Sequence, residues 1–177
     1  MIKVRMFTIA LCLLMAPSVA LAGIIYEVNR TIGAASVIGT IETNGSIGPL
    51  IGDDFVDWTI TIHDGVDTFQ LLGPNSGDNS SVTVRLNKVF ATTSNLMFDF
   101  GGRGFLAFTG SQSIWRLQGS GGKEFVIHNY NNPTSHYSSV SQVPVLSVFA
   151  TIPEPSTLAI FALGIMGLGF RRVKKQQ

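Results

Sequence analysis

The stretch Asp57-Trp58-Thr59-Ile60-Thr61-Ile62-His63-Asp64-Gly65 decides the fold class, because a short strand in it is followed at once by a turn. Trp58, Ile60 and Ile62 alternate with polar residues, and this period of two indicates a half-buried β-strand. The dipeptide Asp64-Gly65 then marks a tight turn. The sequence around this point therefore predicts β structure rather than a helix.

The same alternation recurs along the middle of the chain, in three further segments. These are Val82, Val84 and Leu86 alternating with Thr83 and Arg85; Leu96, Phe98 and Phe100 alternating with Met97 and Asp99; and Phe125 and Ile127 alternating with Glu124, Val126 and His128. Turn signals such as Asn44-Gly45 and Gly101-Gly102 separate the segments, and none reads as an amphipathic helix. We therefore expect an all-β body of about ten short strands, either a jelly-roll-like β-sandwich or a flattened barrel.

The N-terminus has the ordered features of a signal peptide. Lys3 and Arg5 precede an apolar run at 6–16, and Ala20 and Ala22 supply the small residues that a cleavage site needs. We expect signal peptidase to cut after Ala22. This divides the chain into a signal peptide (1–22), a β body (23–151) and a C-terminal segment (152–177).

Charge and cysteine usage narrow the function of the body. Between Gly23 and Ile152 there are ten acidic and six basic residues, which gives a net charge of −4. An acidic body argues against nucleic-acid binding, which needs a basic surface to displace counterions. The single cysteine, Cys12, lies in the first apolar run, so the body has no disulfide and no thiol chemistry.

The C-terminal segment predicts a short membrane anchor. Pro153, Glu154 and Pro155 end the preceding strand, and an apolar run at 157–170 is followed by a basic tail at 171–175. Fourteen residues make about 21 Å of helix against an apolar bilayer core of about 30 Å, so the single transmembrane helix is marginal. The basic tail places the C-terminus in the cytoplasm and the body outside.

This C-terminal segment resembles the PEP-CTERM sorting signal, because Pro153-Glu154-Pro155-Ser156-Thr157, the short apolar helix and the basic tail occur in that order. The resemblance implies a Gram-negative export system in which exosortase, a membrane protease, recognises Pro153, Glu154 and Pro155 and removes a transient anchor. It implies delivery to the cell surface or the medium, alongside exopolysaccharide of the biofilm. The body is similar to a recurring type among PEP-CTERM proteins at 39–48, 56–61 and 96–100, with no activity implied.

No catalytic or cofactor motif is convincing. Gly102–Ala107 matches the dinucleotide pattern G-x-G-x-x-A, but the chain leaves no room for the helix that must receive a pyrophosphate, so a glycine hairpin is the better interpretation. The sequence has no G-x-S-x-G, no H-E-x-x-H and no nucleophilic cysteine in the body. We expect a protein without a cofactor and without enzymatic activity.

Two groups of residues are weaker metal candidates. The three histidines, His63, His128 and His136, lack the short fixed spacing of a metal site, which favours surface or strand-end positions. Asp53, Asp54 and Asp57 precede a strand without an EF-hand or a repeat around them, and whether they bind calcium stays open. We assign no metal ligand.

A sugar-binding face is the last candidate. Tyr130, Tyr137, Trp115 and the asparagine cluster at 129–132 combine aromatic planes with amides, although a polar loop between two strands explains them equally simply. Three hypotheses follow: a non-catalytic surface or matrix protein associated with exopolysaccharide, a carbohydrate-binding module, and a hydrolase with an unrecognised site. An exposed aromatic row would favour the second, and a deep pocket with a paired acid and base the third.

Overall fold

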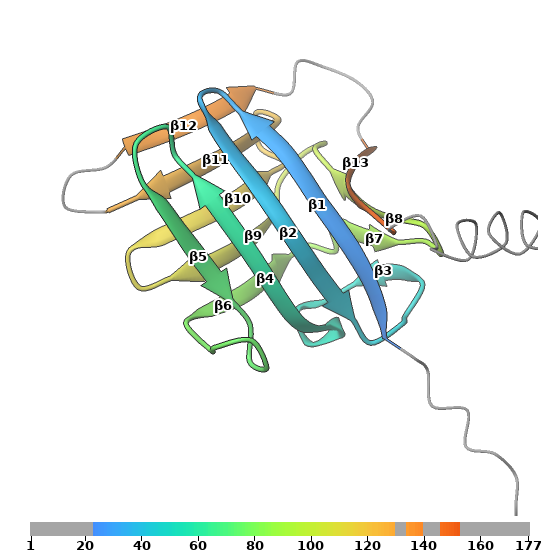
Figure 1. The fold of residues 1–177 in the computed structure, drawn as a ribbon. Coiled ribbons are helices and arrows are strands. Elements are labelled where there is room, and N and C mark those ends of the chain that lie inside the picture. Colours follow the sequence, from blue (N-terminus) through green and yellow to red (C-terminus); the bar gives the residue numbers. More distant parts are fainter. Residues whose placement is uncertain (1–22, 130–133, 140–145, 153–177) are drawn as a thin grey trace, which may run out of the picture.

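The computed structural model describes residues 23–129, 134–139 and 146–152, and these residues form two antiparallel β-sheets (Figure 1). The all-β prediction is confirmed. A three-residue 3-10 helix, η1 (Gly52–Asp54), precedes β4, and no helix in the described part has the length and apolarity needed to cross a bilayer. The expected signal peptide and the expected transmembrane helix lie outside the described residues.

The larger sheet has eight strands. In spatial order they are β3 (Gly48–Leu50), β7 (Val89–Ala91), β8 (Asn95–Asp99), β13 (Leu146–Thr151), β1 (Ile24–Ile32), β2 (Ala35–Thr43), β4 (Phe55–His63) and β5 (Thr68–Leu72). The smaller sheet has five: β12 (Thr134–Ser139), β11 (Lys123–His128), β10 (Ser113–Gln118), β9 (Phe105–Gly110) and β6 (Ser80–Arg85). The described residues thus hold thirteen strands rather than about ten. The three-residue strands β3 and β7 are too short to show an alternation in the sequence.

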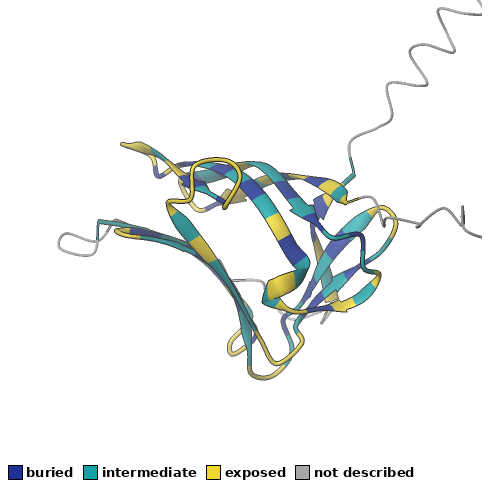
Figure 2. Cartoon of the chain, turned by 90° about the horizontal axis from the view of Figure 1, so that it is seen from below, coloured by how far each residue is buried: buried dark blue, intermediate teal, exposed yellow. Residues whose placement is uncertain are grey.

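The core lies between the two sheets, which form separate layers when the molecule is seen from below (Figure 2). Trp58 from the larger sheet and Trp115 from the smaller one both pack on Phe108, with ring centroids 5.4 and 5.5 Å away. Trp58 Nε1 donates a hydrogen bond of 2.8 Å to Ser80 Oγ, so the indole is buried without losing its polar partner. The alternation at 57–63 correctly predicts which side of β4 is buried.

Strand β11 buries the side that its sequence pattern disfavours. Glu124 and Val126 point into the core, and Phe125 and Ile127 lie on the outer side of the sheet. Glu124 is 0% exposed because its carboxylate meets two partners inside the sandwich, the Arg30 guanidinium and the Trp115 N–H. A hydrophobic pattern cannot anticipate this, because the compensating groups come from other strands.

Two other segments also differ from the sequence interpretation. Leu86 does not continue strand β6, since its φ is +61° and its side chain is 68% exposed in the turn before β7. Gly102–Ala107 leads into strand β9 and not into a helix, which confirms that it is not a dinucleotide loop. The glycines connect β8 in one sheet to β9 in the other, so they form a crossing between sheets and not a hairpin.

Candidate functional site

The outer side of the five-stranded sheet gathers positive charge and aromatic rings. We call this surface the cationic face and define it by Arg85 on β6, Phe105 on β9, Arg116 on β10, and Lys123 and Phe125 on β11. Strand alternation places these residues there, because the intervening residues, such as Trp115 and Val126, point into the core. Pairing in the sheet then brings them together from four strands.

Arg116 lies at the centre of the cationic face. Its guanidinium carbon lies 3.9 Å from the ring centroid of Phe105 and 5.9 Å from that of Phe125. Its Nε is buried and has no hydrogen-bond partner among the described residues. Burial lowers the pKa of Arg116 below its usual value, although an arginine stays protonated at neutral pH. Arg116 is therefore a charged group that lies next to two aromatic rings and has N–H donors without a partner among the described residues.

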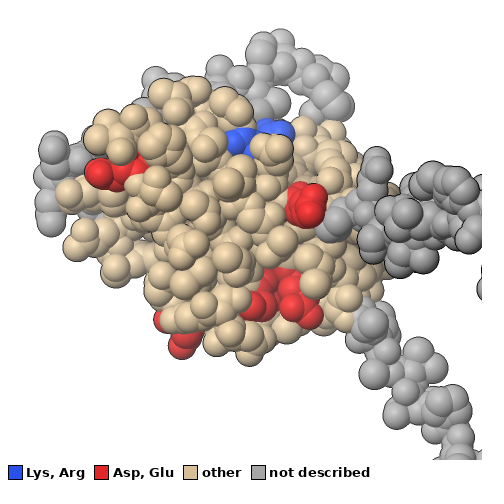
Figure 3. Space-filling model, viewed as in Figure 1, with Lys and Arg blue, Asp and Glu red and all other residues tan. Residues whose placement is uncertain are grey.

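The acidic residues of the body lie elsewhere. No Asp or Glu occupies an outward position of β6, β9, β10 or β11, because the one acid on these strands, Glu124, points inward. Figure 3 shows the opposite side of the molecule, over β1, β2, β4 and β5, where several acidic groups and little basic surface are visible. The two outer faces of the sandwich therefore differ in the sign of their charge.

A partly buried ion pair joins the two sheets. Arg30 on β1 donates to Glu124 on β11 through Nη2 at 2.5 Å and Nε at 3.2 Å, and Trp115 Nε1 donates to the same carboxylate at 3.1 Å. The hydrogen bond to Glu124 raises the pKa of Arg30 above its ordinary value. Every one of these groups is used within the fold, so the arrangement holds the sheets in register and is not a reaction site.

A second polar cluster lies at the β4–β5 turn. Asp64 Oδ1 accepts backbone hydrogen bonds from Val66 and Asp67, and Asp64 Oδ2 lies 3.1 Å from His128 Nδ1. Asp67 Oδ2 lies 4.0 Å from the same nitrogen, and Phe69 stacks on the His128 ring. Ligand atoms of Asp64, Asp67 and His128 all lie within 4.8 Å of one another, a spacing that a divalent cation can draw together.

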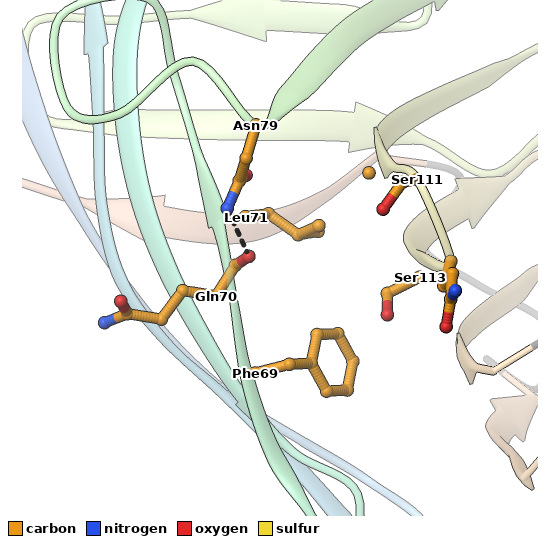
Figure 4. A pocket seen from close by; sticks show the side chains of 8 residues that line it. Phe69, Gln70, Leu71, Asn79, Ser111 and Ser113 are labelled. Atoms are coloured by element: carbon orange, nitrogen blue, oxygen red, sulfur yellow. Dashed lines mark hydrogen bonds between the residues drawn. The ribbon is translucent and has the colours of Figure 1, made fainter.

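Ser113 lies opposite His128 in the β10–β11 pairing, so Asp64, His128 and Ser113 are the residue types of a hydrolytic triad. No hydrogen bond joins Ser113 Oγ to His128 in the part of the chain that the structure describes. Ser113 instead lines a shallow pocket of about 190 Å³ with Phe69, Gln70 and Asn79 (Figure 4). This volume is below the about 300–1,000 Å³ of typical ligand sites, and none of the lining residues is an acid or a histidine.

The structure does not assemble the metal candidates that the sequence suggested. Asp54 accepts hydrogen bonds from Asn44 and from the backbone of Ile51, and Asp57 accepts from the backbone of Asn75. Among the described residues, Asp53, Asp54 and Asp57 are not part of a potential metal cluster.

The structure describes the side chains of two of the three histidines, and it does not place His63 in a potential metal cluster with His128. His63 Nδ1 lies 3.0 Å from the Asp67 carbonyl oxygen at the exposed end of β4, and His128 pairs with Asp64. His136 lies opposite Val126 in the pairing of β12 with β11. Of the three, only His128 belongs to the acidic cluster, and no sequence signal links it to Asp64.

One residue of the suggested sugar-binding group, Trp115, is not on the surface. Trp115 is fully buried in the core and cannot contact a ligand. Residues 130–132 lie outside the described residues, and Tyr137 lies opposite Phe125 in the β11–β12 pairing. Phe105 and Phe125 are aromatic residues that do line an outer face, although the alternation in the sequence favours the buried side of the strand for Phe125.

The C-terminal boundary of the body is well defined. Strand β13 lies between β8 and β1 in the larger sheet, and Ile152 N–H donates a hydrogen bond of 2.8 Å to the Ser94 carbonyl oxygen. The described part of the chain ends there, one residue before Pro153. Residues 151–173 match the family model of the PEP-CTERM protein-sorting motif. The PEP-CTERM motif supports an exported protein that is sorted through the membrane by exosortase-type machinery.

The PEP-CTERM match confirms the resemblance seen in the sequence, and it covers the C-terminal segment rather than the β body. No curated protein and no solved structure matches this chain. Pro153, Glu154 and Pro155 fall within the matched segment but outside the described residues, as do Ala20 and Ala22 of the expected signal-peptide cleavage site.

Proposed function

We propose that this chain is a non-catalytic surface or matrix protein, which exosortase-type processing releases and which then associates with exopolysaccharide. The observation that carries the proposal is the PEP-CTERM motif at 151–173. The motif follows directly on strand β13, so sorting acts on a body whose last strand is already part of the larger sheet.

The positions of the chain ends support membrane processing. Glu27 on β1 lies opposite Thr151 on β13, and these strands are antiparallel. Gly23, the residue after the expected signal-peptide cut, is therefore roughly 13 Å along the strand from the start of the sorting motif. This proximity of Gly23 to the start of the sorting motif supports a single orientation of the body toward the membrane for both expected processing steps.

Within the described residues 23–129, 134–139 and 146–152, no strong catalytic arrangement is present, and this supports a binding role. The pocket beside Ser113 is small, and the His128 imidazole is used by Asp64 and Phe69. The carbohydrate-binding alternative is compatible with this proposal and is favoured by one observation, the aromatic residues Phe105 and Phe125 beside Arg116. A hydrolase that used Asp64, His128 and Ser113 would need Ser113 Oγ within hydrogen-bond reach of His128.

The sorting role is tested by changing Pro153, Glu154 and Pro155 together to alanine. We expect export to continue and the body to stay in the membrane fraction, because the proline-bounded segment is what the processing enzyme would grip. Fractionation with an antibody against the body measures this. A Ser156→Ala/Thr157→Ala variant is the matched control and should be released like the wild type. Equal release of the triple variant and the wild type would contradict the proposal.

A further inference from the structure

We propose that the cationic face binds a carboxylated polysaccharide, with Arg116 as the central contact and Arg85 and Lys123 on either side of it. This inference rests on the proposed association with exopolysaccharide and deepens it, because it names the binding surface and the chemistry of the polymer. The sorting motif by itself requires neither this binding surface nor a carboxylated polymer.

The first argument is the pairing of the basic residues. Arg30 is bound to Glu124 and Lys88 to Asp99 inside the fold. The structure shows no ion pair and no side-chain hydrogen bond for Arg85, Arg116 or Lys123 within the described residues. A guanidinium with a buried, unpartnered N–H has lost part of its hydration without gaining an acceptor. Nη1 and Nη2 of Arg116 are not among the buried unpartnered atoms, so an external carboxylate can reach them and supply acceptors in the planar geometry that arginine prefers.

The second argument is the extent of the charged row. Arg85, Phe105, Gln118 and Lys123 lie side by side on β6, β9, β10 and β11. Three strand spacings separate the two cations, so their strands are roughly 14 Å apart. Arg116 lies in the neighbouring row, opposite Ala107 and Phe125. Positive charges spread over this distance match a polymer with repeated carboxylates better than a single small anion.

The third argument is the presence of aromatic rings between the charges. Phe105 and Phe125 are half-buried on the outer side of the sheet, next to Arg116. The face of an aromatic ring carries partial negative charge and attracts the C–H groups of a sugar ring.

The charge of the whole body favours a polysaccharide over a nucleic acid. The body carries a net charge of −4 between Gly23 and Ile152, so its overall charge repels a densely charged polyanion. Nucleic-acid binding depends on neutralising many closely spaced phosphates, which three cations on an otherwise acidic body do weakly. A carboxylated sugar polymer instead combines spaced charges with apolar ring faces, as the cationic face does.

The experiment uses the full-length chain in mild detergent and measures binding to polygalacturonate, with dextran as the uncharged polymer. We expect polygalacturonate to bind, dextran not to bind, and added salt to weaken binding. The double variant Arg85→Gln/Lys123→Gln should bind about tenfold more weakly, which corresponds to about 1.4 kcal/mol. Both residues are exposed, so the variant should fold normally. Arg116→Lys keeps the charge but not the planar group, and should also weaken binding.

The matched control is Asn29→Asp/Gln70→Glu, which makes the same change in net charge on the exposed side of the larger sheet. It should bind within about twofold of the wild type if the site is on the cationic face, since separate exposed charges are screened. Equal losses in both double variants, no binding to polygalacturonate, or equally strong binding to DNA would each overturn the inference. Binding to the producer's own polysaccharide without binding to polygalacturonate would overturn it while leaving the proposed function intact.

Discussion

Glu124 shows at the scale of a single residue how the fold accommodates a charge. Its carboxylate is fully buried between the sheets and is bound by Arg30 and by the Trp115 N–H. Burying a carboxylate costs free energy that these partners must offset, and breaking the pair leaves the remaining charge unpaired. The same inward turn of Glu124 places Phe125 on the outer face. One residue thus connects the core to the candidate binding surface.

We expect Glu124→Ala to lower the free energy of unfolding by about 3–5 kcal/mol, since it leaves the Trp115 N–H without a partner in the interior and the partly buried Arg30 guanidinium unpaired. Urea unfolding followed by tryptophan fluorescence measures this. The double variant Arg30→Met/Glu124→Leu removes both charges and should recover most of the loss, because an apolar pair of similar volume is often as stable as a buried ion pair. A double variant as unstable as Glu124→Ala would contradict this explanation.

Asp64 makes stability depend on pH. Burial would raise the pKa of its carboxyl, but hydrogen bonds from the backbone of Asp67 and Val66, together with His128, lower the pKa below the ordinary 3.8. A carboxyl whose pKa is lower in the folded state than in the unfolded state stabilises the protein at pH values above the unfolded-state pKa. This contribution is lost as the pH falls from the unfolded-state pKa through the folded-state pKa. Asp64→Asn should therefore cost about 1–3 kcal/mol at pH 7.

At pH 3 the same substitution should cost less, because the wild-type carboxyl then begins to lose its charge. Thermal unfolding of the wild type and Asp64→Asn at both pH values provides the comparison. Asp67→Asn is the control, since Asp67 is mostly exposed and lies 4.0 Å from His128. A loss for Asp64→Asn that is the same at pH 7 and pH 3 would show that charge is not responsible.

At the scale of elements, the pairing of β2 with β4 depends on a close approach of two backbones. Gly39 on β2 has a φ of +149°, and a Cβ at this position would lie 1.9 Å from the Thr59 carbonyl oxygen on β4. Only glycine fits there, because any side chain would push apart two of the central strands of the larger sheet. The glycine sits inside a strand and not at a turn, which is why local sequence rules assign it no role.

The turn between β6 and β7 is strained, and this gives a prediction for an element boundary. Leu86 and Asn87 both have positive φ, which suits glycine or asparagine but not leucine. Leu86→Gly should raise the free energy of unfolding by about 1 kcal/mol, because Leu86 is exposed and loses little packing.

Val66→Gly is the matched control for this turn. Val66 is 80% exposed in the β4–β5 turn but is not among the positive-φ residues of the described chain, so glycine there only adds flexibility to the unfolded state. Chemical denaturation of both variants distinguishes relief of backbone strain from simple removal of an exposed apolar side chain. If both substitutions stabilised the protein to the same degree, the cause would be removal of an exposed apolar side chain and not relief of backbone strain.

At the scale of the whole molecule, the first and last described strands are neighbours. Strand β13 pairs with β1 on one side and β8 on the other, so the larger sheet is incomplete until residues 146–151 are in place. The sorting motif begins at the end of this strand. Charge is divided at the same scale, with unpaired cations on the outer side of the smaller sheet and carboxylates elsewhere. The proposed binding of an anionic polymer would use the outer side of the smaller sheet.

The sequence by itself determined the all-β class, the buried side of β4 and the sorting motif, because each depends on residues that are close together in the chain. Period-two alternation identifies Trp58 as a core residue, and the order of proline, apolar run and basic tail identifies the C-terminal signal. These signals are local, and the structure and the family match confirm them.

Only the tertiary structure decided which side of β11 is buried, where Arg116 lies and which groups surround His128. The reason in each case is a partner from a distant segment: Arg30 for Glu124, Phe105 for Arg116 and Asp64 for His128. The free energy of burying or exposing these side chains depends on charges and rings that the fold brings together across the two sheets.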